Sequence, residues 1–87
     1  MQDLDDIAAY IAKESGEAEI GRGFILNFFD VAKLYANQPD AGAPRDRYGP
    51  GVRSFLVGNY VAYYQKRRHG ISVVKIRHGA RKAPKSI

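Results

Sequence analysis

The first 36 residues show a helical pattern of hydrophobic and polar positions. The stretch DLDDIAAYIAKE, residues 3 to 14, has apolar residues at the i, i+3, i+4, i+7 spacing of one helix face, namely Leu4, Ile7, Ala8 and Ile11. Asp3 is a suitable N-cap, and Asp5 and Asp6 suit the positive end of the helix dipole. We therefore predict a first helix that begins after Asp3 and ends at Ser15-Gly16.

A second helix is predicted from Glu17 to Ala36. Its expected buried stripe consists of Ile20, Phe24, Phe28, Val31, Leu34 and Tyr35, with Phe29 at its margin. Gly21 and Gly23 should each weaken this helix by about 1 kcal/mol relative to alanine. Because so few residues separate the two helices, we expect them to form an antiparallel hairpin.

The period changes after a loop that runs from Asn37 to Gly51 and contains three of the four prolines. Three strand-like segments follow, at residues 52–58, 60–67 and 71–78, separated by Gly58-Asn59 and by a turn at residues 68–70. Helices first and strands afterwards indicate an α+β fold, in which the helical hairpin packs on a small antiparallel meander. Residues 79–87 form a basic tail without periodicity.

Length and composition indicate one domain, residues 1–87, with a small core. The chain has no cysteine, which excludes disulfides, thiolate catalysis and cysteine-based metal sites. No apolar run approaches the roughly 18 residues of a membrane span. The acidic N-terminus is unlike the basic start of a secretory signal, so we predict a cytoplasmic protein without a membrane partner.

The charges are divided unevenly along the chain. Residues 1–44 carry eight acids and three bases, whereas residues 45–87 carry eleven bases and a single acid, Asp46. The formal charges of the two halves are therefore −5 and +10. This asymmetry indicates either a basic face for a polyanion or an acidic protein, or a set of solvated strand ends that keeps the protein soluble.

Three stretches together resemble the ParE branch of the RelE/ParE toxins, the toxic halves of bacterial type II toxin–antitoxin pairs. They are DLDDIAAYIA at residues 3–12, VRSFLVGNYVAYY at 52–64 and HGAR at 78–81. The resemblance covers residues 3 to 82. The pair VRxFxVGNY and HGAR carries most of its specificity, since the helix motif alone is weak.

The resemblance implies a helical hairpin against a curved antiparallel sheet. RelE-like members are ribosome-dependent endonucleases of messenger RNA, whereas ParE-like members poison DNA gyrase without an established set of catalytic residues. A cognate ParD-like antitoxin wraps either kind of toxin with its C-terminal segment, and its other part binds promoter DNA. The toxin would thus meet promoter DNA only indirectly. The resemblance therefore leaves three possibilities: a gyrase inhibitor, an mRNA endonuclease, or an inactive remnant that only binds its antitoxin.

One departure from the family pattern concerns the sheet. Family members begin with a β-strand before the first helix, and this sequence has no such strand. Its absence should expose unpaired backbone groups or an uncovered apolar strip. An upstream start, the antitoxin, or another copy of the chain would each fill this gap.

The ribonuclease hypothesis needs a base, an acid and cations around one phosphate. Histidine can act as an acid or a base at neutral pH, and arginine binds phosphate well, so the candidates are His78, Arg53 and Arg81. Strand alternation, however, places Arg77 and His78 on opposite faces, with His78 in phase with Val74 and Ile76. The alternative role for His78 is structural, as a strand-end histidine bonded to backbone.

Binding of target or antitoxin is the other role expected for this basic region. Its candidates are Arg53, Arg77, Arg81 and Lys82. Arg53 shares a face with Phe55 and Val57, so its alternative is an ion pair with a helix acid.

Tyrosines and histidines complete the candidate chemistry. Tyr60 and Tyr64 should share one face and Tyr63 the other, so most of this set is expected in the core rather than stacked on RNA bases. His69 and His78 have no third ligand nearby, and we predict neither a metal site nor a cofactor.

Overall fold

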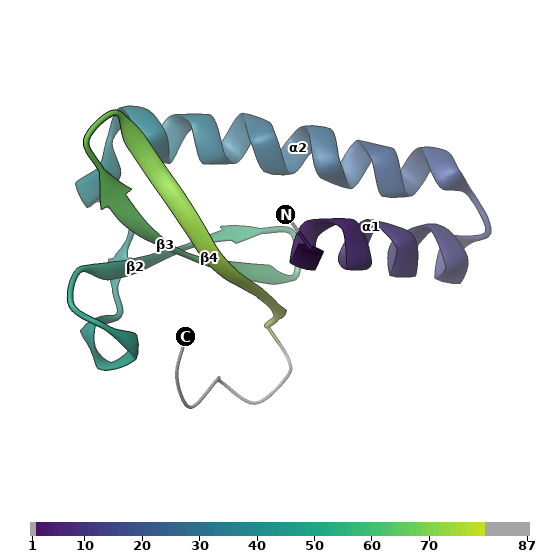
Figure 1. Cartoon of the computed structure of the whole chain (residues 1–87). Coiled ribbons are helices and arrows are strands. Elements are labelled where there is room, and N and C mark those ends of the chain that lie inside the picture. Colours follow the sequence, from purple (N-terminus) through teal and green to yellow (C-terminus); the bar gives the residue numbers. More distant parts are fainter. Residues whose placement is uncertain (1, 80–87) are drawn as a thin grey trace.

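The computed structural model describes residues 2–79 and shows two helices followed by a four-stranded antiparallel sheet (Figure 1). The helices are α1 (Gln2–Ser15) and α2 (Ala18–Asn37), and the strands are β1 (Ala43–Pro44), β2 (Val52–Val57), β3 (Tyr60–Arg67) and β4 (Gly70–His78). Short 3-10 turns span Pro39–Ala41 and Asp46–Tyr48. The α+β prediction is confirmed, whereas the basic tail after Gly79 lies outside the described residues.

The helical hairpin forms as predicted, with two local differences. Gly16 ends α1 with a φ of 74°, a left-handed conformation that glycine adopts without strain. Asp3 is not the N-cap, because α1 already includes Gln2. A Cβ on Gly21 would lie 2.6 Å from the backbone oxygen of Ala8. Gly21 is therefore the close contact between the two helices rather than a simple weakness, whereas a Cβ on Gly23 would meet no atom within 4 Å.

The buried stripe of α2 is rotated slightly from the one predicted. Phe28 is buried at its centre, and the partly buried residues that pack beside it are Phe24, Ile25, Val31, Ala32 and Tyr35. Ile20 and Leu34 were wrongly assigned to the stripe, since they are 47% and 66% exposed. The contact of α2 with α1 at Gly21 fixes this rotation, because it turns the neighbouring Ile20 towards solvent.

The strands lie in the order β1-β2-β3-β4, so the predicted meander is correct for the last three strands. β2 and β3 pair through Phe55 opposite Ala62, and Gly58 makes their turn with a φ of 57°. The two-residue strand β1 was missed, because prolines and glycines dominate the segment and predict a loop. Ala43 nevertheless pairs with Ser54 and adds a fourth strand at the edge.

The pairing of β3 with β4 contains a β-bulge. Tyr63 lies opposite Lys75 and Tyr64 opposite Val73, so Val74 is an extra residue in β4. Ile71, Val73 and Ile76 all belong to the core on the helix side, whereas Val74 packs on the other face. The predicted shared phase of Val74 with Ile76 is therefore wrong, because the bulge breaks the alternation between them.

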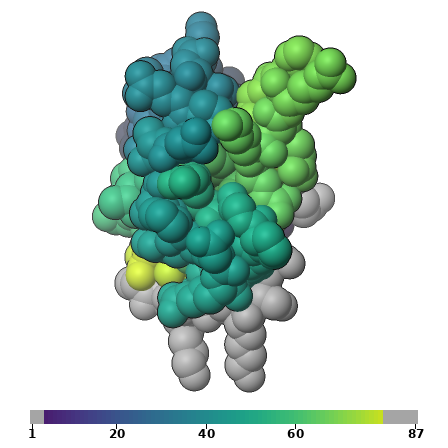
Figure 2. Space-filling model, turned by 90° about the vertical axis from the view of Figure 1, so that its left-hand side faces the viewer, coloured from purple at the N-terminus to yellow at the C-terminus, as the bar shows by residue number. Residues whose placement is uncertain are grey.

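Apolar residues cover both faces of the sheet. The main core lies between the helices and the sheet, and its buried members are Leu4, Phe28, Phe55, Val57, Ala62, Tyr64 and Ile76. A smaller cluster of Tyr48, Val52 and Tyr63 lies on the opposite face, where the loop between α2 and β2 folds over the sheet. Figure 2 shows this end of the molecule, with the loop in teal and the β3–β4 hairpin projecting in green.

Candidate binding surfaces

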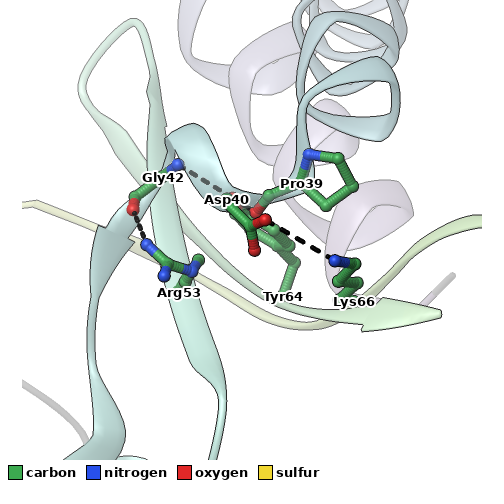
Figure 3. Close-up of polar contacts among 6 residues, drawn as sticks. All are labelled: Pro39, Asp40, Gly42, Arg53, Tyr64 and Lys66. Carbon is green, nitrogen blue, oxygen red and sulfur yellow. Dashed lines mark hydrogen bonds and ion pairs between the residues drawn. The ribbon is translucent and has the colours of Figure 1, made fainter.

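Arg53 lies on the helix side of β2, where it helps to hold the turn after α2 (Figure 3). Its Nη1 donates a hydrogen bond of 2.7 Å to the carbonyl oxygen of Gly42. The Tyr64 hydroxyl donates to the Pro39 carbonyl oxygen at 2.7 Å and accepts from the Gly42 N–H at 3.0 Å. The sequence left an ion pair with a helix acid as the alternative role of Arg53, and in the structure the guanidinium binds this backbone turn instead.

Two further properties mark the Pro39–Gly42 turn as structural. Burial raises the pKa of Tyr64 above its ordinary value of 10.0, against the smaller opposing effects of the Gly42 N–H and the Arg53 charge. Lys66 pairs with Asp40 at 3.5 Å on the exposed side of the same turn (Figure 3). Arg53 thus connects β2 to the turn, and its hydrogen bond stabilises the fold directly.

Arg77 and His78 lie on opposite faces at the end of β4, as strand alternation predicts. The Arg77 Nε donates a hydrogen bond of 2.9 Å to the Tyr63 hydroxyl on the face away from the helices. The His78 ring packs edge-on against Tyr60, with centroids 5.2 Å apart. Tyr60 contacts the helix-side core, so His78 faces the helices.

The candidates for ribonuclease chemistry are spread over the sheet. Arg53 on β2 pairs with Tyr64 of β3, and His78 on β4 pairs with Tyr60 of β3. Arg53 and His78 are therefore about 13 Å apart along the direction of β3, and they lie on the two strands that flank it. Arg81 and Lys82 lie outside the described residues. Residues 2–79 contain no group of three side chains able to hold a metal ion.

Two of the grooves that border the helices have mainly apolar linings. One, of about 790 Å³, lies between α1 and the β2–β3 turn and includes Ile7, Tyr10, Phe24 and His78. The other, of about 650 Å³, lies between the helices and β4 and includes Phe29. Among the described residues no strand precedes α1, and β4 forms one edge of the sheet. Ile71 and Val73 of β4 line the second groove together with Phe29.

A further groove, of about 420 Å³, lies mainly on the face of the sheet away from the helices and extends to Tyr35 of α2 and Phe55. Three arginines line it, Arg45, Arg47 and Arg77, and its described lining includes no carboxylate. We call it the arginine groove. Arg45 and Arg47 come from the loop over the sheet, and Arg77 comes from β4.

Arg77 is among the binding residues predicted from the sequence, whereas Arg45 and Arg47 are not. Both lie in the segment predicted to be a loop, and no motif marks them. The available signal was the spacing of two arginines around Asp46, the single acid of residues 45–87. Only the folded loop shows that both arginines come close to Arg77.

A helical hairpin packed on a small antiparallel sheet defines a small α+β domain. The model of the family described as ParE toxin of type II toxin-antitoxin system, parDE, matches residues 1–83. The chain therefore belongs to the ParE toxin family, and membership implies an antitoxin partner. A search of curated proteins found no match.

Within residues 2–79, neither helix combines the length and the apolar character needed to cross a bilayer.

Proposed function

We propose that this member of the ParE family acts as a toxin by binding DNA gyrase in the bacterial cytoplasm, and that its antitoxin blocks this action. The geometry that supports binding over catalysis is the dispersion of the candidate catalytic groups. Arg53 is bound to the Gly42 carbonyl and pairs with Tyr64 on β3. His78 lies against Tyr60, which is four residues before Tyr64 on the same strand. A ribonuclease site needs its acid, base and cations within reach of one phosphate.

A supercoiling assay with purified gyrase tests this proposal. We expect the chain to inhibit supercoiling or to accumulate gyrase–DNA cleavage complexes, and we expect the antitoxin, added in equal amount, to relieve the effect. No effect at large molar excess over gyrase would remove gyrase as the target while leaving the antitoxin partnership intact.

The endonuclease alternative has its own test. Messages in a translation extract should stay intact when the chain is added, and His78→Ala should make no difference. Cut messages that disappear with His78→Ala would overturn the proposal in favour of RNA cleavage. Induction of the chain in bacteria without growth arrest would instead indicate an inactive antitoxin-binding remnant.

A further inference from the structure

The lining of the arginine groove includes neither Arg53 nor His78, the described candidates for ribonuclease chemistry. We propose that the groove is the docking site for an acidic, extended peptide segment of the partner, with an apolar side chain seated on Leu56. This inference rests on the proposed function in that the expected partner is the antitoxin. Three features of the groove support this proposal. Tyrosines hold two of the arginines in place, the nearby Asp46 is not part of the lining, and the groove contains an exposed leucine.

The first feature is that buried tyrosines hold two of the three arginines in place. Arg47 donates a hydrogen bond of 2.9 Å to the Tyr48 hydroxyl, and its guanidinium lies 4.8 Å from the centre of that ring. Arg77 is held in the same way by Tyr63. The two rings meet edge to face, with centroids 5.2 Å apart. Arginines held in this way lose less conformational entropy when they bind a carboxylate.

The second feature is the position of Asp46, the acid nearest to these arginines in sequence. Its Oδ1 accepts a hydrogen bond of 3.0 Å from the Gly51 N–H, within the loop that carries Arg45 and Arg47. Its carboxylate therefore shapes the loop, and it is not part of the groove lining. A lining with three cations and no described acid complements a segment rich in aspartate and glutamate.

The third feature is the floor of the groove, which favours a peptide over a nucleic acid. Leu56 is 69% exposed there, beside the half-buried Val61. Among the aromatic residues of the lining, Phe55 and Tyr63 are buried, and the partly buried Tyr35 already stacks one ring face on Phe55. The groove therefore lacks the row of free rings on which successive bases of a single-stranded nucleic acid stack. An exposed leucine among arginines suits an alternation of acidic and apolar side chains.

A binding assay with a defined probe tests the proposal. The probe is a fluorescein-labelled peptide of alternating glutamate and leucine, about as long as a strand that crosses the sheet, and fluorescence anisotropy measures its affinity. We expect Arg45→Ala combined with Arg47→Ala to weaken binding by about tenfold or more. The matched control, Arg67→Ala with Arg68→Ala, removes the same charge from the exposed β3–β4 hairpin and should change the affinity less than about twofold.

A second variant guards against misfolding of the double mutant. Leu56→Asp places a charge at an exposed position without disturbing the core, and it should also weaken peptide binding while the circular dichroism spectrum stays unchanged. Equal losses for the groove and hairpin variants would reduce the interaction to general charge attraction and overturn the proposal. An oligouridine that displaces the peptide at similar concentration, with affinity indifferent to Leu56→Asp, would overturn it in favour of nucleic acid.

The outcome is independent of the gyrase assay. Groove-dependent peptide binding by a chain that leaves gyrase unaffected would remove the proposed target and keep the docking site. Inhibition of gyrase without groove-dependent peptide binding would do the reverse.

Discussion

Tyr63 and Tyr64 are neighbours on β3, and both are almost fully buried, with 1% and 0% exposure, yet they belong to different faces of the sheet. Tyr64 faces the helices, and its hydroxyl bonds the backbone of the Pro39–Gly42 turn. Tyr63 faces the other way, and its hydroxyl accepts a hydrogen bond from Arg77. The same residue type thus fixes the fold on one face and positions a cation on the other.

The largest effect is expected from a substitution that disrupts the helix-side contact between Gly42 and Tyr64. A Cβ at Gly42 would overlap the Tyr64 hydroxyl, and that side chain has no exposed surface into which it can move. Gly42→Ala should therefore lower the free energy of unfolding by about 3 kcal/mol, the upper end of overpacking costs. Urea denaturation measures it. In a Tyr64→Phe background the loss should be smaller, because the nearest overlapping atom, the hydroxyl oxygen, is gone and only the ring carbons at 2.7 and 2.8 Å still overlap the new Cβ. Fully additive losses would contradict a clash with the hydroxyl.

The next effect compares the two tyrosines directly. Tyr64→Phe leaves the Gly42 N–H and the Pro39 carbonyl without their partner, and should cost about 1–3 kcal/mol. Tyr63→Phe should cost less than about 1 kcal/mol, because the partly buried Arg77 can turn towards water. Urea midpoints at an unchanged m-value give both numbers. Equal costs would show that the two faces do not differ in this way.

Alkaline pH tests the contribution of Tyr64 on the helix side. Because burial raises the pKa of Tyr64 above 10.0, the unfolded chain releases this proton at a lower pH than the folded chain does. The contribution of Tyr64 to stability is therefore complete below pH 10 and falls as the pH rises from there towards the folded pKa. Urea titrations from about pH 9 to about pH 11 should show a shallower decline in Tyr64→Phe than in the parent. Identical declines would contradict the role of Tyr64.

The smallest effect concerns the exposed end of the helix-side network. Asp40 and Lys66 form an ion pair of 3.5 Å whose side chains are 74% and 61% exposed. Asp40→Asn should change the free energy of unfolding by less than about 0.5 kcal/mol. A thermal melt compared with that of Gly42→Ala in the same buffer tests this ranking. A loss of stability as large as that of Gly42→Ala would show that the ion pair, rather than Tyr64, contributes most of the stability of this network.

The elements of the fold were predictable because their signals are local. Helical spacing, Gly16 and Gly58 locate the hairpin and the β2–β3 turn, and alternation correctly placed Tyr64 and Tyr63 on different faces. Local rules failed at Gly21, where a contact with another helix determines the role of the glycine.

The candidate sites were harder to predict because they depend on contacts between distant segments. Arg53 was expected to meet an acid or a phosphate, but its partner is the backbone of Gly42, eleven residues away in a loop. Arg45 and Arg47 come close to Arg77 only when that loop folds over the sheet. Side-chain type and spacing do not encode such a contact.

The bulge at Val74 also bears on how such a surface can change. Because Val74 is one extra residue in β4, it sets whether odd or even positions after it face the arginine groove. Loss of Val74 alone would remove the bulge and leave Lys75 opposite Tyr63, so Arg77 and His78 would keep their partners and their faces. The bulge can therefore absorb a deletion of one residue in β4 without removing Arg77 from the groove.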